Sequence, residues 1–218
     1  MPTFGLRGAK VAKYNNTNGV VTYDAPISAG CAIQANLELT FAEARLYACD
    51  MLSEYLREAI GGTITFGAKL FPDAAQQLMF GSTEKTRSVT VPAAGGTTDT
   101  KTIKSLVTSG NDNADYVGFS CYCPDLINNV RKYTAFYVAK VKFSPPSKNL
   151  QTRTDSIAFV TPSTTGQFMP DDTANAVIIE SATCDSEDEA KAWCQAVFPQ
   201  AQQSAQTPAS GGEGGGTP

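Results

Sequence analysis

The residues best suited to chemistry in this chain are its six cysteines, because histidine is absent from all 218 residues. Without histidine, Ser-His-Asp and Cys-His nucleophiles and most zinc sites are excluded. Cys121 and Cys123 alternate along a predicted strand, so their thiols share one face, as at the start of a site for a soft metal. No second pair of closely spaced cysteines accompanies them. We therefore predict that both are buried as small hydrophobic residues, and that the protein uses no metal and no cofactor.

Two further cysteines, Cys184 and Cys194, flank the start of a predicted helix and are placed so that they could meet in a disulfide. The opening "MPTFGLRGAK" has no apolar segment typical of a secretory leader. This favours synthesis in a reducing cytoplasm, where free thiols are the rule. We expect mostly free, buried thiols, with a bond between Cys184 and Cys194 as the less favoured alternative.

The acidic residues have structural interpretations. The cluster at 186–189 lacks the alternating spacing and central glycine of a calcium loop, and acidic side chains are typical of the first turn of a helix. Asp24, Asp171 and Asp172 lie at predicted turns, which Asp favours through hydrogen bonds to its own backbone. A hydrolase with a pair of carboxylates remains an alternative, but no motif supports it. We predict that the chain is not an enzyme.

The composition favours a mainly β protein. Only 17% of the residues are charged, and Thr, Ser, Gly, Pro and Asn, which favour strands and turns, take their place. The formal net charge is −4, and no stripe of basic residues typical of a nucleic-acid binder is visible. No apolar run approaches the length of a membrane-spanning helix. We expect a mainly β fold with flanking helices.

Apolar alternation and turn residues predict most of the elements. Strands are predicted over 8–14, 19–27, 31–40, 61–70, 87–92, 115–123, 131–143 and 175–182. A helix is predicted over 71–81, with Pro72 at its first position and Gly81 at its end. A second helix follows Ser186, which forms a capping box with Glu189. The stretch 93–101 reads as a loop.

The segment "MLSEYLREAI" at 51–60 is ambiguous. Leu52, Tyr55, Leu56 and Ile60 form a helical stripe, whereas a strand would fit them less well, so the local pattern favours a helix.

Several stretches, in this order, resemble a known family. They are "MPTFGLRGAKVAKY", "VTYDAPI", "ANLELTFAEARLYACD", "GGTITFGAKLFPDAAQQLMFG" and "KYTAFYVAKVKFSPPSKNLQTRTDSIAFVTPSTTGQF". Together they resemble the phi13-type major tail proteins of long-tailed bacteriophages, over roughly 1–169. The loop 93–113 and the chain from Pro170 onward match less well.

The resemblance implies a tail tube subunit. The expected fold is a β-sandwich or rolled sheet with one packed helix, and each subunit contributes strands to a barrel shared between subunits. Hexameric rings would stack into a tube in the virion, assembled in the host cytoplasm, through which DNA passes without specific binding. Other tail proteins (tape measure, terminator, baseplate or distal tail) would be its partners. An acidic channel would not trap DNA through counterion release.

The resemblance also assigns roles to two segments. The strands 132–143 and 155–168 would belong to the barrel, with Pro145 and Pro146 ending the sheet at one rim, because proline cannot continue a strand ladder. The segment 44–60 would be a long hairpin loop that reaches the neighbouring ring. Tyr47, Tyr55 and Leu56 are its candidate contact residues, and the alternative is that they belong to the core of the subunit.

The resemblance and composition together suggest three parts. We expect a tail-tube β domain over 1–169, a strand and helix over 170–198 that pack on or extend it, and a flexible tail over 199–218. The main alternative function is a monomeric β-sandwich module for binding or adhesion. That module would expose an aromatic platform, yet the single tryptophan, Trp193, lies on the predicted face of a helix.

Overall fold

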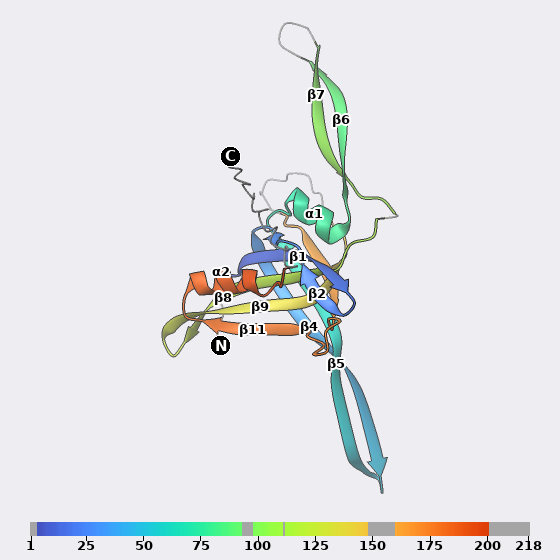
Figure 1. Cartoon of the computed structure of the whole chain (residues 1–218), viewed down its shortest axis with the longest axis vertical. Helices are drawn as coiled ribbons and strands as arrows, with labels where there is room; N and C mark the ends of the chain where they lie inside the picture. Colours follow the sequence, from blue (N-terminus) through green and yellow to red (C-terminus); the bar gives the residue numbers. More distant parts are fainter. Residues whose placement is uncertain (1–3, 93–97, 111, 148–159, 201–218) are drawn as a thin grey trace, which may run out of the picture.

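The computed structural model describes residues 4–92, 98–110, 112–147 and 160–200. In this part the chain is mainly β, with antiparallel sheets and two helices, as the composition predicts (Figure 1). The strands are β1 (Arg7–Thr17), β2 (Val20–Tyr23), β3 (Ile27–Ser28), β4 (Ala32–Ala48), β5 (Met51–Ala68), β6 (Thr83–Pro92), β7 (Thr98–Val107), β8 (Val117–Ile127), β9 (Val130–Phe143), β10 (Ser163–Met169) and β11 (Ile179–Cys184). The helices are α1 (Asp73–Phe80) and α2 (Glu187–Ala196).

Nine strands form one sheet, in the order β2-β1-β8-β9-β10-β5-β4. The short β3 also pairs with β1, and β11 pairs with β9 over Tyr133–Val138, next to the stretch of β9 that β10 occupies. The strands β6 and β7 form a separate two-stranded sheet. The predicted strands over 8–14, 31–40, 61–70, 87–92 and 131–143 lie within or overlap these elements, so the alternation pattern located most of the sheet.

The sheet is rolled around its main core. Ala9 and Val11 of β1 share one buried cluster with Ile64 and Phe66 of β5, although β1 and β5 lie far apart in the strand order. The two ends of the sheet must therefore face each other across that cluster. Helix α1 closes the same core with Ala75, Met79 and Phe80, and it ends at Gly81 with φ of 72°, as predicted.

Helix α2 covers the other face of the sheet. Successive side chains of β9 point to opposite faces, so Val138 lies in the main core, whereas Ala135 and Tyr137 face α2 and Phe198. The predicted capping box is confirmed, because the Ser186 side chain accepts from the backbone N–H of Glu189 and the Glu189 carboxylate accepts from that of Ser186. The segment 170–198 therefore extends the same sheet and packs on it.

Two local predictions are wrong. Residues 51–60 are not helical but form the first part of β5, which pairs with β4 over almost its whole length. Gly61 and Gly62 let this strand run on into the body, since a Cβ at Gly62 would lie 2.0 Å from the Glu38 carbonyl oxygen and 2.4 Å from the Phe168 ring. Thr98–Lys101, predicted as loop, begins β7.

The two strands expected on either side of Pro145 and Pro146 correspond to β9 and β10, and the second begins later than expected. Strand β9 ends at Phe143, just before Pro145 and Pro146. The return strand was predicted over 155–168. Residues 160–162 are not in a strand and β10 begins at Ser163, while 155–159 lie outside the described residues.

The first two residues of the predicted tail, Pro199 and Gln200, are paired with the body. The Tyr23 backbone N–H donates to the Pro199 carbonyl oxygen at 2.7 Å, and Gln200 forms a bridge to Tyr23. The chain thus stays paired with the end of β2 through Gln200. The remainder, 201–218, lies outside the described residues.

Candidate assembly surfaces

The thiols that sequence reasoning singled out are buried. Cys121 and Cys123 lie on β8, and burial raises the pKa of the Cys121 thiol far above its usual range and that of Cys123 to about 11. Thiols held protonated in this way are poor nucleophiles and poor metal ligands. Among the described residues, no group of three or more His, Cys, Asp or Glu side chains is placed to hold a metal. The prediction of buried, hydrophobic cysteines is confirmed at these two positions.

The prediction about the other cysteines is partly wrong. All six lie in described parts of the chain and are free thiols, so Cys184 and Cys194 are not joined in this structure. Cys194 is buried, but Cys31 and Cys49 are exposed, because they lie at the ends of β4 where no core covers them.

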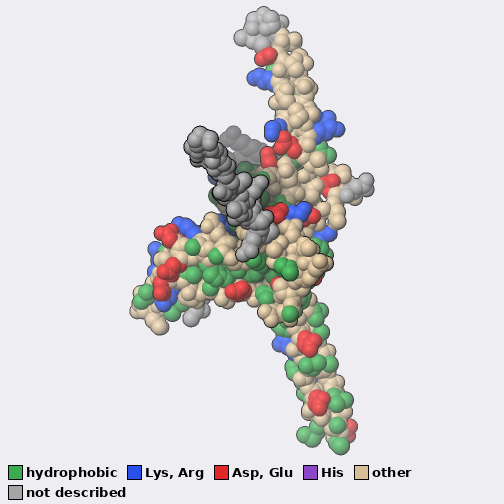
Figure 2. Space-filling model, viewed as in Figure 1, with side chains coloured by type: hydrophobic (Ala, Val, Ile, Leu, Met, Phe, Trp, Pro, Cys, Tyr) green, Lys and Arg blue, Asp and Glu red, His purple; other side chains and the backbone are tan. Residues whose placement is uncertain are grey.

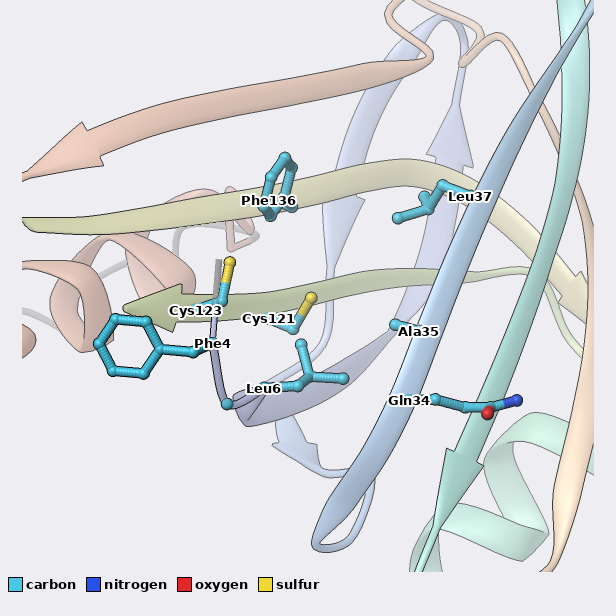
Figure 3. A pocket seen from close by; sticks show the side chains of 9 residues that line it. Phe4, Leu6, Gln34, Ala35, Leu37, Cys121, Cys123 and Phe136 are labelled. Carbon is cyan, nitrogen blue, oxygen red and sulfur yellow. The ribbon is translucent and has the colours of Figure 1, made fainter. Parts of the chain in front are cut away.

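The two cysteines of β8 border an open pocket of about 380 Å³ between β4, β8, β9 and the N-terminal segment (Figure 3). Phe4 and Leu6 line it from the N-terminal segment, Leu37 from β4 and Phe136 from β9, while Gln34 supplies the single amide side chain. The lining is almost entirely apolar. Among its lining residues there is no pair of acid and base groups.

The candidate acids have structural roles. Asp171 accepts from the backbone N–H groups of Thr173 and Val177, so it shapes a turn, as predicted. Asp172 accepts from Lys140 Nζ at 2.8 Å and from the Tyr14 hydroxyl at 2.8 Å. These hydrogen bonds, that from Lys140 foremost, hold the pKa of Asp172 at about 2.

The most distinctive surface is the outer part of the β4–β5 hairpin, which projects from the body (Figure 1). We call residues 41–60 the β4–β5 arm. Every residue from Glu38 to Ile60 is exposed, so no part of the body covers this hairpin. The exposed fractions of Tyr47, Tyr55 and Leu56 are 63%, 48% and 58%. The candidate contact residues are therefore not in the core of the subunit.

The register assigns the side chains of the arm to two faces. Directly opposite residues of an antiparallel pair share a face, so Tyr55, which pairs with Arg45, lies on the same side as Tyr47. Leu56 pairs with Ala44 and lies on the other side. Sequence reasoning grouped Tyr47, Tyr55 and Leu56 together, but the structure separates Leu56 from the two tyrosines.

The face with the tyrosines is held together by arginines. Arg45 Cζ lies 5.6 Å from the centroid of the Tyr55 ring, and Arg57 Cζ lies 3.8 Å from that of Phe41. Both guanidinium groups also pair with Glu43, at 3.3 and 3.5 Å. Contacts of this kind stabilise a ribbon that has no core of its own.

The other face of the arm is apolar and acidic. Ala44, Leu46, Met51 and Leu56 lie on it, and Leu46 and Met51 are 56% and 71% exposed. Sequence reasoning missed Leu46 and Met51, because a helical reading of 51–60 gave them no common face. Figure 2 shows hydrophobic side chains gathered along this arm, with acidic groups among them.

A second arm projects on the opposite side of the body, formed by β6 and β7 (Figure 1). We call it the β6–β7 arm, residues 83–107. Lys104 Nζ pairs with the Glu84 carboxylate at 2.8 Å on one of its faces. Its surface in Figure 2 is mostly polar, with basic groups and few hydrophobic ones. The two arms therefore differ in chemical character.

A polar surface lies on the face of β9, β10, β5 and β4 that is turned away from the main core. The register places Lys142, Gln167, Thr63 and Glu38 in one row across β9, β10, β5 and β4. The next row contains Thr165, Thr65 and Asn36. We call these seven residues the polar face. Hydroxyl and amide groups dominate it, and apolar side chains are absent from both rows.

The aromatic platform expected of a binding module does not form around the single tryptophan. Trp193 is half-buried between the two clusters that α2 makes with the sheet. Within the described residues, neither helix has both the length and the apolar character needed to cross a membrane. Comparison of the sequence with protein-family models and with curated proteins gave no match.

Proposed function

We propose that this chain is the major tail tube subunit of a long-tailed bacteriophage, a structural protein that assembles into stacked hexameric rings. The observation that carries the proposal is the β4–β5 arm. The body of the subunit buries its own core, yet the arm exposes Leu46, Tyr47, Met51 and Leu56 with no cover from the rest of the described chain. Apolar surface concentrated in this way is typical of an interaction site.

The free edge of the main sheet supports ring formation. Among the described strands, β4 pairs only with β5, so the other edge of this 17-residue strand has no partner. An unpaired edge of this length is a template for pairing with another chain. In the proposed ring each subunit adds its strands to a shared barrel, and pooling strands from several copies leaves an open lumen. Head-to-tail contacts close by rotation into a ring.

The polar face is the surface we assign to the channel. Its hydroxyl and amide groups suit contact with water, whereas an apolar face would suit contact with protein. It contains one carboxylate, Glu38, and one ammonium group, Lys142, and the latter donates to Asn113 at 2.7 Å. A surface without a cluster of cations does not hold phosphates through counterion release, so DNA would pass along it.

The proposal needs no catalytic group, metal or cofactor. Such a subunit would act only through its repeated contacts with other copies. Its other partners would be further tail proteins (tape measure, terminator, and baseplate or distal tail protein). Its place would be the tail of the virion.

Electron microscopy of the purified full chain tests the proposal. We expect negatively stained samples to show rings and tubes with a central channel, and sedimentation velocity to show species far larger than one chain. The monomeric binding module predicts a single slow species instead. A protein that remains strictly monomeric up to millimolar concentration, even with a phage tail initiation complex present, would overturn the proposal.

A further inference from the structure

Three of the four cations of the β6–β7 arm lie on one face of the ribbon. The register places Lys85, Arg87 and Lys101 on one side of this ribbon, together with Ile103 and a single carboxylate, Asp99. Ile103 is 50% exposed. No ion pair within the described residues involves these three cations, whereas the cation on the opposite face, Lys104, is paired with Glu84.

The β4–β5 arm carries the opposite pattern on its apolar face. Glu54 pairs in register with Leu46, and Glu58 with Ala42, so both carboxylates lie on the same side as Leu56. Neither carboxylate makes an ion pair within the described residues. On the other face of the arm, in contrast, Glu43 is paired with both arginines.

The net charges of the arms are opposite. Four carboxylates and two guanidinium groups give residues 41–60 a net charge of −2. Two carboxylates against four cations give residues 83–107 a net charge of +2. The two arms thus attract each other, but they project on opposite sides of one body and cannot meet within one chain (Figure 1).

The spacing of the charged groups also matches. Glu54 and Glu58 are four residues apart on β5, with Leu56 between them. On the basic face Lys101 pairs with Val89, which lies four residues from Lys85, and the row between contains Ile103 and Arg87. At about 3.4 Å per residue, both pairs of charges are separated along their ribbons by about 14 Å. On each face a branched apolar residue, Leu56 or Ile103, lies in the row between the two charged residues, and on the basic face Arg87 shares that row.

We propose that the acidic face of the β4–β5 arm docks on the basic face of the β6–β7 arm of a second copy of this chain, in the next ring. The inference rests on the proposed function and adds to it the surface on which the β4–β5 arm docks. The two arms of one copy point in opposite directions (Figure 1). Each copy can therefore dock its β4–β5 arm on one neighbour and receive the β4–β5 arm of another neighbour on its β6–β7 arm. The contact is head-to-tail and repeats without limit, as a filament requires.

Charge reversal tests this pairing. One variant carries Glu54→Lys and Glu58→Lys, and another carries Lys85→Glu and Lys101→Glu. In each variant alone, arms of like charge face each other at every ring junction. We expect the critical concentration for tube formation to rise by at least about tenfold, because several weakened pairs add up around each ring.

Mixing the two variants gives the sharpest result. When they alternate, every junction again joins arms of opposite charge, so the mixture should form tubes that neither variant forms alone. A chain with all four substitutions should also assemble. Failure of both rescues, with circular dichroism showing folded protein, would overturn the inference.

Lys104→Glu is the matched control for Lys101→Glu. It makes the same change of charge on the same strand but on the opposite face, so assembly should change little, whereas Lys101→Glu alone should weaken it. Tubes that tolerate Lys101→Glu as well as the control would overturn this inference and leave the proposed function standing. Absence of tubes in the unmodified protein would overturn both.

Discussion

Arg57 lies over the ring of Phe41, with 3.8 Å between Cζ and the ring centroid, at the base of the β4–β5 arm. The same guanidinium group contacts the Glu43 carboxylate at 3.5 Å. A two-stranded ribbon is marginally stable on its own, so such cross-strand contacts decide whether the arm stays paired outside the body.

We therefore expect Arg57→Ala to loosen the arm and spare the body. The loss of an exposed cation–π contact costs about 0.5–1 kcal/mol, which is large for an isolated ribbon. Hydrogen exchange measured by mass spectrometry should become faster over 41–60 and remain unchanged in β8 and β9. Arg131→Ala removes a comparable contact to Phe4 outside the arm and serves as the control. Equal exchange in the arm of the two variants would contradict the prediction.

Replacement of Tyr47, Tyr55 and Leu56 by serine should leave a folded subunit that no longer forms tubes. The three side chains are exposed, so the variant loses no core packing, whereas hot-spot residues at an interface contribute about 2 kcal/mol each. Circular dichroism and sedimentation on one sample separate folding from assembly. A control with serine at Val20 and Val130, which are 63% and 56% exposed outside the arm, should assemble normally. A triple variant that polymerises like the parent protein would exclude these residues from the contact.

The turn at the tip of the β4–β5 arm could be made more stable by substitution. Cys49 and Asp50 connect β4 to β5 with φ angles of 53° and 61°, a geometry that Asn-Gly adopts with less strain. Changing both residues to Asn-Gly should stabilise the arm by about 1 kcal/mol. Slower proteolysis within 41–60, at an unchanged melting temperature of the body, would show this. Faster cleavage at the tip would indicate that the present turn is already the better one.

The buried tyrosines of β2 and β9 should respond unequally to loss of a hydroxyl. Tyr23 donates to the Ala139 carbonyl oxygen at 2.7 Å, so the hydrogen bond of 2.6 Å between the two tyrosines is donated by Tyr137. Tyr23→Phe leaves both partners unsatisfied and should cost about 1–3 kcal/mol, whereas Tyr137→Phe leaves the bond to Ala139 and should cost about 0.5–1.5 kcal/mol. Urea denaturation measures both, and a larger loss for Tyr137→Phe would reverse the assigned direction.

Acid should weaken the contact of Asp172 with Lys140. The pKa of Asp172 in the folded protein is about 2, below its ordinary value of 3.8, so its contribution is complete above about pH 4 and is lost as the pH falls toward about 2. Asp172→Asn should lower stability at neutral pH and reduce the further loss between about pH 4 and pH 2. Urea midpoints at several pH values test this, and an unchanged dependence on pH in the variant would contradict it.

The sequence predicted the position of strands and helices correctly where one face of the element is buried. The alternation over 31–40 located β4, and Ser186 and Gly81 marked where helices begin and end, because these signals act within a few residues. The turn at Asn18-Gly19, with φ angles of 53° and 83°, follows from the same local chemistry.

Both errors of secondary structure fall on the arms, which have no buried face. A ribbon exposed on both sides does not require apolar and polar residues to alternate along its strands. The spacing of Leu52, Tyr55 and Leu56 therefore matched a helix by chance. Thr98–Lys101 contains no apolar residue, so nothing in it indicated a strand. The face that each residue takes depends on the register between β4 and β5, including the shift between Thr40 and Phe41. That register is set by pairing between distant residues and was not predictable from local pattern.

The strands of the β4–β5 arm are the same strands that border the main core, and β5 continues as one strand from the exposed part to Ile64 and Phe66. A force that pulls on the tip along the strands is therefore transmitted directly to the main sheet. It acts parallel to the strands, so many inter-strand hydrogen bonds resist it together. The shift between Thr40 and Phe41, where one ladder step is interrupted, is the natural point of flexure. An assembly built on such arms would bend by small deflections at each of these points while its subunits kept their shape.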